Sequence, residues 1–148
     1  MGTAATILLV EDNEDDVFLM TRALTQAGIN NPVRVAEDGR AAIHYLSGQG
    51  VFEDRAAHPL PALILLDLKL PITSGFEVLS WIRGQAQLKA LPVVVVTSSD
   101  EPADLERAAG LKADAYIVKP PAPSQLVELA DQLKWHWLVR DSGKLSST

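Results

Sequence analysis

The chain has 148 residues, 47% of them hydrophobic and 22% charged, which suits one globular domain with an apolar core. Its net charge of −6 argues against broad contact with nucleic acid or acidic lipid, which attract surfaces rich in Lys and Arg. The lack of cysteine excludes disulfides, thiol catalysis and cysteine-based zinc sites. Without a bilayer-length apolar run or a basic signal region, we expect a cytoplasmic protein that does not enter a membrane.

Short apolar runs alternate with segments of helical periodicity along the chain. Several of these runs are continuous in Leu, Ile or Val, as in parallel strands that are covered on both faces. The predicted strands are Thr6–Val10, Val33–Ala36, Ala62–Asp67, Val93–Thr97 and Ala115–Val118. Five strand–helix units in sequence predict an α/β fold with a doubly wound five-stranded parallel sheet.

A helical segment follows each predicted strand. The first carries Val17, Met20, Leu24 and Ala27 on one face and ends at Gly28. The other predicted helices are Asp38–Leu46, Phe76–Arg83, Pro102–Ala109 and Ser124–Val139.

Two segments lack either periodicity. Gly48–Pro61 contains two glycines and two prolines, which predicts an exposed loop before the third strand. Residues 141–148 are polar and rich in serine, so we expect a flexible tail there. We therefore expect one domain over residues 1–140 and no output domain.

Chemically active side chains follow four of the predicted strands. In open parallel sheets, ligands bind beyond the carboxyl ends of the strands. The residues at those ends are Glu11, Asp12, Asp67, Thr97, Ser98, Lys119 and Pro120. Three carboxylates brought together repel one another unless a cation is present, and Mg²⁺, or Mn²⁺ in its place, prefers such oxygen ligands. The sequence therefore predicts a divalent metal site at this edge.

Each of these residues also has a simpler interpretation. Asp12 could cap a helix, and Asp67 could be a turn residue. Thr97 and Ser98 could cap the fourth helix, and Lys119 could be a solvated surface charge. Their joint placement at four strand ends favours a single site for metal-assisted transfer of an anionic group.

Four strings in the chain carry a family resemblance. They are Ile7-Leu8-Leu9-Val10-Glu11-Asp12, then Ile64-Leu65-Leu66-Asp67-Leu68-Lys69-Leu70-Pro71, then Val93-Val94-Val95-Val96-Thr97-Ser98, and finally Ala115-Tyr116-Ile117-Val118-Lys119-Pro120. With these strings the chain resembles the CheY-like receiver domain of two-component response regulators, from about Thr6 to Val139. The resemblance implies the strand order 2-1-3-4-5.

The resemblance also assigns roles at the metal site. It implies that Asp67 takes a phosphoryl group from a phosphohistidine on a sensor histidine kinase or a phosphotransfer protein. Asp12 would bind Mg²⁺ directly, Glu11 would bind it through water, and the backbone carbonyl of Lys69 would complete the protein ligands. Glu11 stands where the family more often has Asp, and either carboxylate can serve the metal.

The remaining implied roles concern the phosphoryl group and the response to it. Lys119 would pair with the phosphoryl oxygens, and the hydroxyl of Thr97 would donate to them. Tyr116 would swing inward and repack the surface of the fourth helix, fifth strand and fifth helix, although an ordinary core aromatic explains Tyr116 equally well. The bond from Lys119 to Pro120 is expected to be cis.

The last predicted helix carries an aromatic residue outside its apolar stripe. Advancing 100° per residue places Trp135 roughly opposite the stripe, near Glu128 and Asp131. We interpret Trp135 as an interface residue, most simply of a homodimer through this helix, with packing onto the tail as the alternative. The Gly48–Pro61 loop and the Trp137-Leu138 ending resemble single-domain regulators that partner phytochrome-type histidine kinases.

Three other functions compete with a signalling switch. A phosphatase with an aspartyl nucleophile generally needs a second Asp two positions later, where this chain has Lys69. A flavodoxin-like flavin carrier would place a phosphate against the acidic residues from Glu11 to Asp16, which would repel it. A degenerate receiver would act without phosphorylation. The chain, however, keeps all four residues that phosphorylation needs, namely Asp12, Asp67, Thr97 and Lys119. We therefore expect a switch and not a turnover enzyme.

Overall fold

The computed structural model describes residues 5–139, and the predicted tail at residues 141–148 lies outside them. Five parallel strands form one sheet in the order β2-β1-β3-β4-β5, which confirms the predicted fold class and strand order. The strands are β1 (Ile7–Val10), β2 (Val33–Ala36), β3 (Leu63–Leu66), β4 (Val93–Thr97) and β5 (Ala115–Val118). The α-helices are α1 (Glu14–Gln26), α2 (Gly39–Ser47), α3 (Gly75–Gly84), α4 (Pro102–Gly110) and α5 (Pro123–Gln132).

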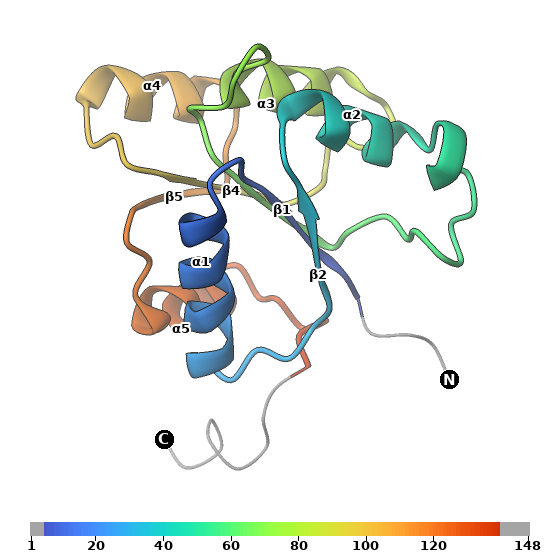
Figure 1. Ribbon diagram of the computed structural model, residues 1–148. Coiled ribbons are helices and arrows are strands. Elements are labelled where there is room, and N and C mark those ends of the chain that lie inside the picture. The colour runs from blue at the N-terminus through green and yellow to red at the C-terminus, as the bar shows by residue number, and fades with distance from the viewer. Residues whose placement is uncertain (1–4, 140–148) are drawn as a thin grey trace.

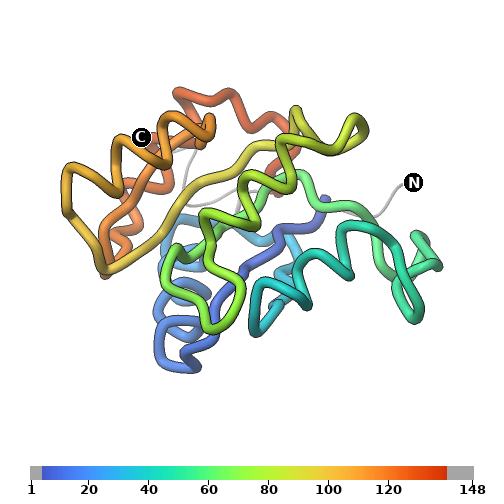
Figure 2. Tube along the Cα trace, turned by 90° about the horizontal axis from the view of Figure 1, so that it is seen from above, coloured from blue at the N-terminus to red at the C-terminus, as the bar shows by residue number. Residues whose placement is uncertain are grey.

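The helices cover both faces of the sheet. Helices α1 and α5 lie on one face, and α2, α3 and α4 lie on the other (Figure 1). Figure 2 looks onto the second layer, where these three helices lie side by side. No helix in residues 5–139 is long and apolar enough to cross a membrane.

Alternation along the central strands builds the core. Ile7 and Leu9 of β1 face the α1/α5 layer, whereas Leu8 and Val10 face the α2/α3 layer. Side chains on a strand point alternately to the two faces of the sheet, so a strand that is covered on both faces must be apolar at every position. This explains why the central strands appear as unbroken apolar runs.

Helix α5 is shorter than predicted. It ends at Gln132 and not at Val139, because Lys134 adopts a left-handed backbone conformation with φ of 55°. The Trp135 N–H then donates to the carbonyl of Ala130 at 2.9 Å, which closes a Schellman-type helix end with a lysine in the usual glycine position. The helical periodicity therefore stops before Trp135.

The prediction that Trp135 lies on the solvent face is wrong for this reason. Trp135 is only 4% exposed and packs in the α1/α5 side of the core, with its ring stacked on Trp137 at a centroid distance of 5.7 Å. Asn31 holds the segment after α5 in place: its side-chain amide donates to the Trp137 carbonyl and its Oδ1 accepts from the Val139 N–H. The residues after α5 therefore complete the core.

The loop before β3 is held by specific contacts, and a short 3-10 helix (Gly50–Phe52) interrupts it. The Arg55 guanidinium donates to the carbonyls of Tyr45 and Leu46 at the end of α2, each at 2.8 Å. The Tyr45 hydroxyl donates to the carbonyl of Pro59 at 2.7 Å. The insertion thus packs against α2.

Gly75 sets the path of the chain between β3 and α3. It is buried at the first position of α3, and its N–H donates to the Leu68 carbonyl at 3.0 Å. A Cβ at this position would collide with the Asp67 carbonyl oxygen and would lie 2.6 Å from the Leu68 Cα. Because both obstacles are backbone atoms, only glycine fits there without a shift of the loop that follows Asp67.

We predict that Gly75→Ala lowers the free energy of unfolding by about 1–3 kcal/mol, since the loop must move to admit the methyl group. Gly84→Ala at the other end of α3 is the matched control, because a Cβ there meets nothing within 4 Å. The control should change stability by less than about 1 kcal/mol, toward greater stability. Urea denaturation measures both, and equal stability of the two variants would contradict the packing at Gly75.

Candidate functional site

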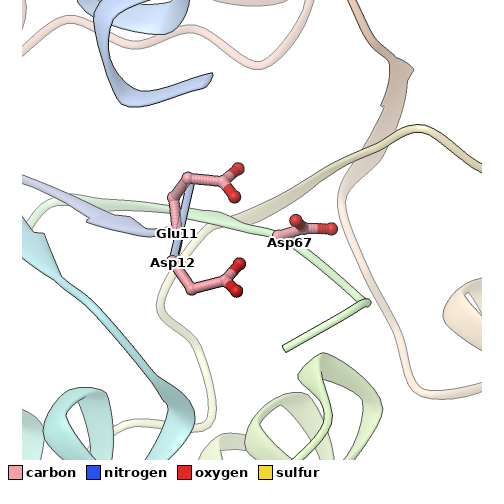
Figure 3. Close-up of side chains that lie close together, drawn as sticks. All are labelled: Glu11, Asp12 and Asp67. Atoms are coloured by element: carbon pink, nitrogen blue, oxygen red, sulfur yellow. The ribbon is translucent and has the colours of Figure 1, made fainter. Parts of the chain in front are cut away.

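Sheet topology brings three carboxylates together. Strands β1 and β3 are neighbours and Val10 is in register with Leu66, so the residues that follow both strands emerge side by side. Carboxylate oxygens of Glu11, Asp12 and Asp67 lie within 4.8 Å of one another (Figure 3). Glu11 and Asp67 are buried, whereas Asp12 is exposed. The prediction that these three carboxylates gather at one edge of the sheet is thus confirmed.

Lys119 reaches this cluster from the end of β5. Its backbone N–H donates to the Thr97 carbonyl at 2.8 Å, which fixes the chain beside β4. Its Nζ lies 2.7 Å from Glu11 Oε1, 2.8 Å from Asp16 Oδ2 and 3.0 Å from Asp67 Oδ2. The lysine side chain is only 13% exposed, so these are partly desolvated ion pairs, and the interpretation of Lys119 as a solvated charge is wrong.

Asp16 is a site residue that the sequence reasoning missed. From the sequence it is one of several acids that would repel a phosphate, whereas in the structure it pairs with Lys119. Helical periodicity carried a signal for it: Asp16 lies four residues before the buried Met20, whereas Asp15 lies four residues before the exposed Leu19. An acid on the inward face at the active edge of the sheet needs a partner.

Asn13, and not Asp12, caps α1. The Asn13 Oδ1 accepts a hydrogen bond from the Asp16 N–H at 3.0 Å, the usual role of an N-cap side chain. Helix α4 begins after Glu101 without a side-chain cap, so Thr97 and Ser98 do not cap it. Capping therefore does not explain Asp12, Thr97 or Ser98.

The surroundings of Glu11 disfavour the charged form of its carboxylate. Burial raises the pKa of Glu11 to about 7, and the nearby Asp67 charge adds to the rise that the Lys119 hydrogen bond opposes. For Lys119, burial lowers the pKa, but its bonds to Asp16, Glu11 and Asp67 outweigh this and hold it above the ordinary value. One ammonium therefore only partly compensates the carboxylates that surround it.

Both carboxylate oxygens of Asp67 are held. Oδ1 accepts from the Lys69 backbone N–H at 3.1 Å, and Oδ2 accepts from Lys119 Nζ. These two bonds fix the plane of the carboxylate at the edge of the sheet. The predicted role of the Lys69 carbonyl as a metal ligand stays a prediction.

Thr97, the last residue of β4, has an unusual side chain. It is fully buried, and its Oγ1 has no hydrogen-bond partner among the described residues. A buried hydroxyl without a partner costs about 1–3 kcal/mol, so natural proteins rarely keep one without a reason. The hydroxyl is thus available to an incoming acceptor.

Tyr116 and Ser99 link β5 to the start of α4. The Tyr116 hydroxyl donates to the Ser99 carbonyl at 2.9 Å, and the Ser99 hydroxyl donates to Asp104 in the first turn of α4 at 2.6 Å. Tyr116 is half-buried on the sheet edge. The bond between Lys119 and Pro120 is cis.

The donor set suits a hard divalent cation. Glu11, Asp12 and Asp67 offer only carboxylate oxygens, which Mg²⁺ and Mn²⁺ accept, and no sulfur or imidazole is part of the cluster. The pKa of Glu11 is raised mainly by burial, and a cation beside it would favour the charged carboxylate. The residues present therefore fit a divalent metal ion.

Comparison with known proteins agrees with this geometry. Residues 7–131 match the response regulator receiver domain family. The chain is 38% identical to the probable methanogenesis regulatory protein FilR2 of Methanothrix harundinacea, over 89% of this chain and 83% of that protein. It is 36% identical to the response regulator Rcp1 of Synechocystis sp., over 89% of this chain and 88% of Rcp1.

Solved structures of phytochrome response regulators share the fold. The bacteriophytochrome response regulator RtBRR has a TM-score of 0.79 and 42% identity, covering 88% of this chain and 78% of its own. Rcp1 in its Mn²⁺-bound form has a TM-score of 0.73 and 36% identity, and the match covers 90% of this chain and 94% of Rcp1. The phosphorylated cyanobacterial phytochrome response regulator RcpA has a TM-score of 0.75 and 35% identity, and the match covers 91% of this chain and 94% of RcpA. The chain therefore belongs to the response regulator receiver domain family, with phytochrome response regulators among its relatives.

Proposed function

We propose that this receiver is a phosphorylation-driven switch in which Asp67 accepts the phosphoryl group. The observation that carries the proposal is the environment of Asp67: a buried carboxylate with both oxygens fixed, beside Glu11, Asp12 and the Lys119 ammonium. A carboxylate held in this way is a suitable nucleophile for an aspartyl phosphate. The donor is the phosphohistidine of a sensor histidine kinase or of a phosphotransfer protein.

The transfer exchanges one bond for another. An Asp67 oxygen attacks phosphorus, the bond from phosphorus to the histidine nitrogen breaks, and its electron pair returns to the imidazole. Glu11, Asp12, Asp67 and the Lys69 carbonyl would hold the divalent ion, which supplies positive charge to the phosphoryl oxygens when bound. Lys119 provides a fixed positive charge next to Asp67, and the two bonds to Asp67 orient it for attack.

The switch is read out through Thr97 and Tyr116. An acceptor oxygen on Asp67 would give the unpaired Thr97 hydroxyl a partner, so movement toward it is favourable. Tyr116 is bonded to the carbonyl of Ser99, two residues after Thr97, so a shift of that loop changes the position of the ring. The expected result is a repacked α4-β5-α5 surface.

The signal leaves by protein contact in this proposal. The similarity to phytochrome response regulators supports a phytochrome-type kinase as the donor. Leu105 of α4 and Val118 of β5 are exposed apolar residues on the α4-β5-α5 face, which suits homodimerisation there. Trp135 does not contribute to that face, because it is buried within the chain. Cytoplasmic location and the absence of nucleic-acid binding stay predictions.

Catalytic turnover of an external phosphate ester has no support at the site. A second acid two positions after Asp67 would be needed, and Lys69 occupies that position with an exposed side chain. A receiver that acts without phosphorylation is the alternative function, and the following experiment separates the two.

We predict that acetyl phosphate with Mg²⁺ adds one phosphoryl group to the wild-type chain, seen by intact-protein mass spectrometry. Asp67→Asn should remain unmodified, because the amide keeps the size of the side chain but is not a nucleophile. Excess chelator should abolish labelling of the wild type. Equal labelling of both proteins would overturn the assignment of Asp67, and an unlabelled wild type would favour the phosphorylation-independent receiver.

We predict that Thr97→Val weakens binding of a phosphoryl mimic without destabilising the fold. Valine has nearly the same shape and removes an unpaired buried hydroxyl, so the free energy of unfolding should stay equal or rise by up to about 1–3 kcal/mol. Affinity for beryllofluoride in Mg²⁺, which mimics the phosphoryl group, should fall. A clear loss of stability, measured by urea denaturation, would mean that the hydroxyl has a partner in the resting protein.

The raised pKa of Glu11 predicts a pH dependence of stability in chelator. Between the ordinary value of 4.5 and about 7, the folded state binds more protons at this group than the unfolded state does. The contribution of Glu11 to stability therefore falls as pH rises through this window, by about 1–3 kcal/mol in total. The difference between wild type and Glu11→Gln in urea denaturation isolates it. A difference that is constant from pH 4.5 to 7.5 would contradict the raised pKa.

A further inference from the structure

The geometry points to Asp16 as a competitor of the phosphoryl group: its carboxylate occupies the Lys119 donor that a phosphoryl oxygen on Asp67 needs. The inference rests on the proposed phosphorylation of Asp67 and adds a residue that sets how readily the phosphorylated state forms and how long it lasts. Asp16 touches neither the phosphoryl group nor the metal in this account. It acts through Lys119 and is therefore a positioning residue.

The donors of Lys119 are fully used in the resting structure. An ammonium has three N–H donors, and three carboxylates lie within 3.0 Å of Nζ, on Glu11, Asp16 and Asp67. A phosphoryl oxygen can therefore bind Lys119 only if one existing bond is released. The affinity of Lys119 for the phosphoryl group is reduced by the cost of that exchange.

Asp16 is the partner that leaves at least cost. Its side chain is 30% exposed, whereas those of Glu11 and Asp67 are 4% and 6% exposed. Water can solvate the Asp16 carboxylate after release, but the two buried carboxylates would lose a partner without gaining water. In addition, the phosphoryl group is attached to Asp67, so Asp67 stays beside Lys119 both before and after phosphorylation.

The position of Asp16 is not explained by the helix terminus alone. Glu14, Asp15 and Asp16 all lie in the first turn of α1, where acids are favoured by the helix dipole. Of these three, Asp16 alone is half-buried and pairs with Lys119. The Asn13 side chain accepts from the backbone N–H of Asp16 and fixes this turn, so the carboxylate is held toward β5.

Asp16 also adds negative charge near the site of phosphorylation. A phosphoryl group on Asp67 is an anion, and its attraction to Lys119 competes directly with the ion pair at 2.8 Å. Removal of the Asp16 charge should therefore strengthen the hold of Lys119 on the phosphoryl group. The Asp16–Lys119 ion pair also joins α1 to the residue that follows β5, so release of Asp16 would loosen this link.

The test compares Asp16→Asn and Asp16→Ala with Asp15→Asn, a matched control that removes the same charge from the same helical turn at an exposed position. Beryllofluoride binding is followed by ¹⁹F NMR at saturating Mg²⁺, and the lifetime of the phosphorylated protein is followed after acetyl phosphate is removed. We expect both Asp16 variants to bind beryllofluoride roughly threefold to tenfold more tightly than wild type, with a lifetime longer by a similar factor. Asp15→Asn should match the wild type in both measurements.

Each outcome decides one claim. Tighter binding in the two Asp16 variants but not in Asp15→Asn supports competition for Lys119, and a merely structural role would not produce this gain. Equal changes in Asp15→Asn and Asp16→Asn would reduce the effect to general charge and overturn the inference, as would weaker binding in the Asp16 variants. A wild-type chain that binds no beryllofluoride would instead overturn the proposed function of Asp67.

Discussion

The ion pairs of Lys119 are the interaction on which the site depends. Parallel strands in the order 2-1-3-4-5 deliver Glu11, Asp12 and Asp67 to one edge, and such a cluster repels itself in a partly dry environment. Lys119 lies at the end of β5, two strands away from β3, and its long side chain reaches back to the cluster. This single ammonium ties β5 to β1, β3 and α1, the elements that surround the site.

Two unfavourable features remain in the resting site, and both have a functional meaning. Burial, together with the nearby Asp67 charge, raises the pKa of Glu11, and a divalent ion beside it would favour the charged carboxylate. The buried hydroxyl of Thr97 lacks a hydrogen-bond acceptor at the end of β4, and in the proposed function a phosphoryl oxygen on Asp67 would supply one. A metal ion and a phosphoryl group would each relieve one of these costs, so the resting structure is poised for both ligands.

The sequence predicted most of the fold and the main site, because the relevant signals are local. Each central strand is a continuous apolar run, and polar residues begin where the strand ends, so the sequence predicts Asp67 at the active edge; Lys119 follows the edge strand β5 in the same way. Two residues were misjudged where the outcome depends on backbone geometry beyond the local pattern. Helical periodicity predicts Trp135 on the solvent face, because nothing in the sequence marks Lys134 as a left-handed helix end. Helical periodicity places Asp16 on the inward face, but nothing in the sequence identifies its partner Lys119, which lies 103 residues away along the chain.

The most direct test of the central claim is to map the acyl phosphate chemically. Borohydride reduces an aspartyl phosphate to homoserine, so peptide mass spectrometry after acetyl phosphate, Mg²⁺ and borohydride identifies the modified residue among Asp12, Asp16 and Asp67. The account predicts homoserine at position 67 and unmodified aspartate at positions 12 and 16. Homoserine at either of those two positions, with aspartate retained at 67, would contradict it.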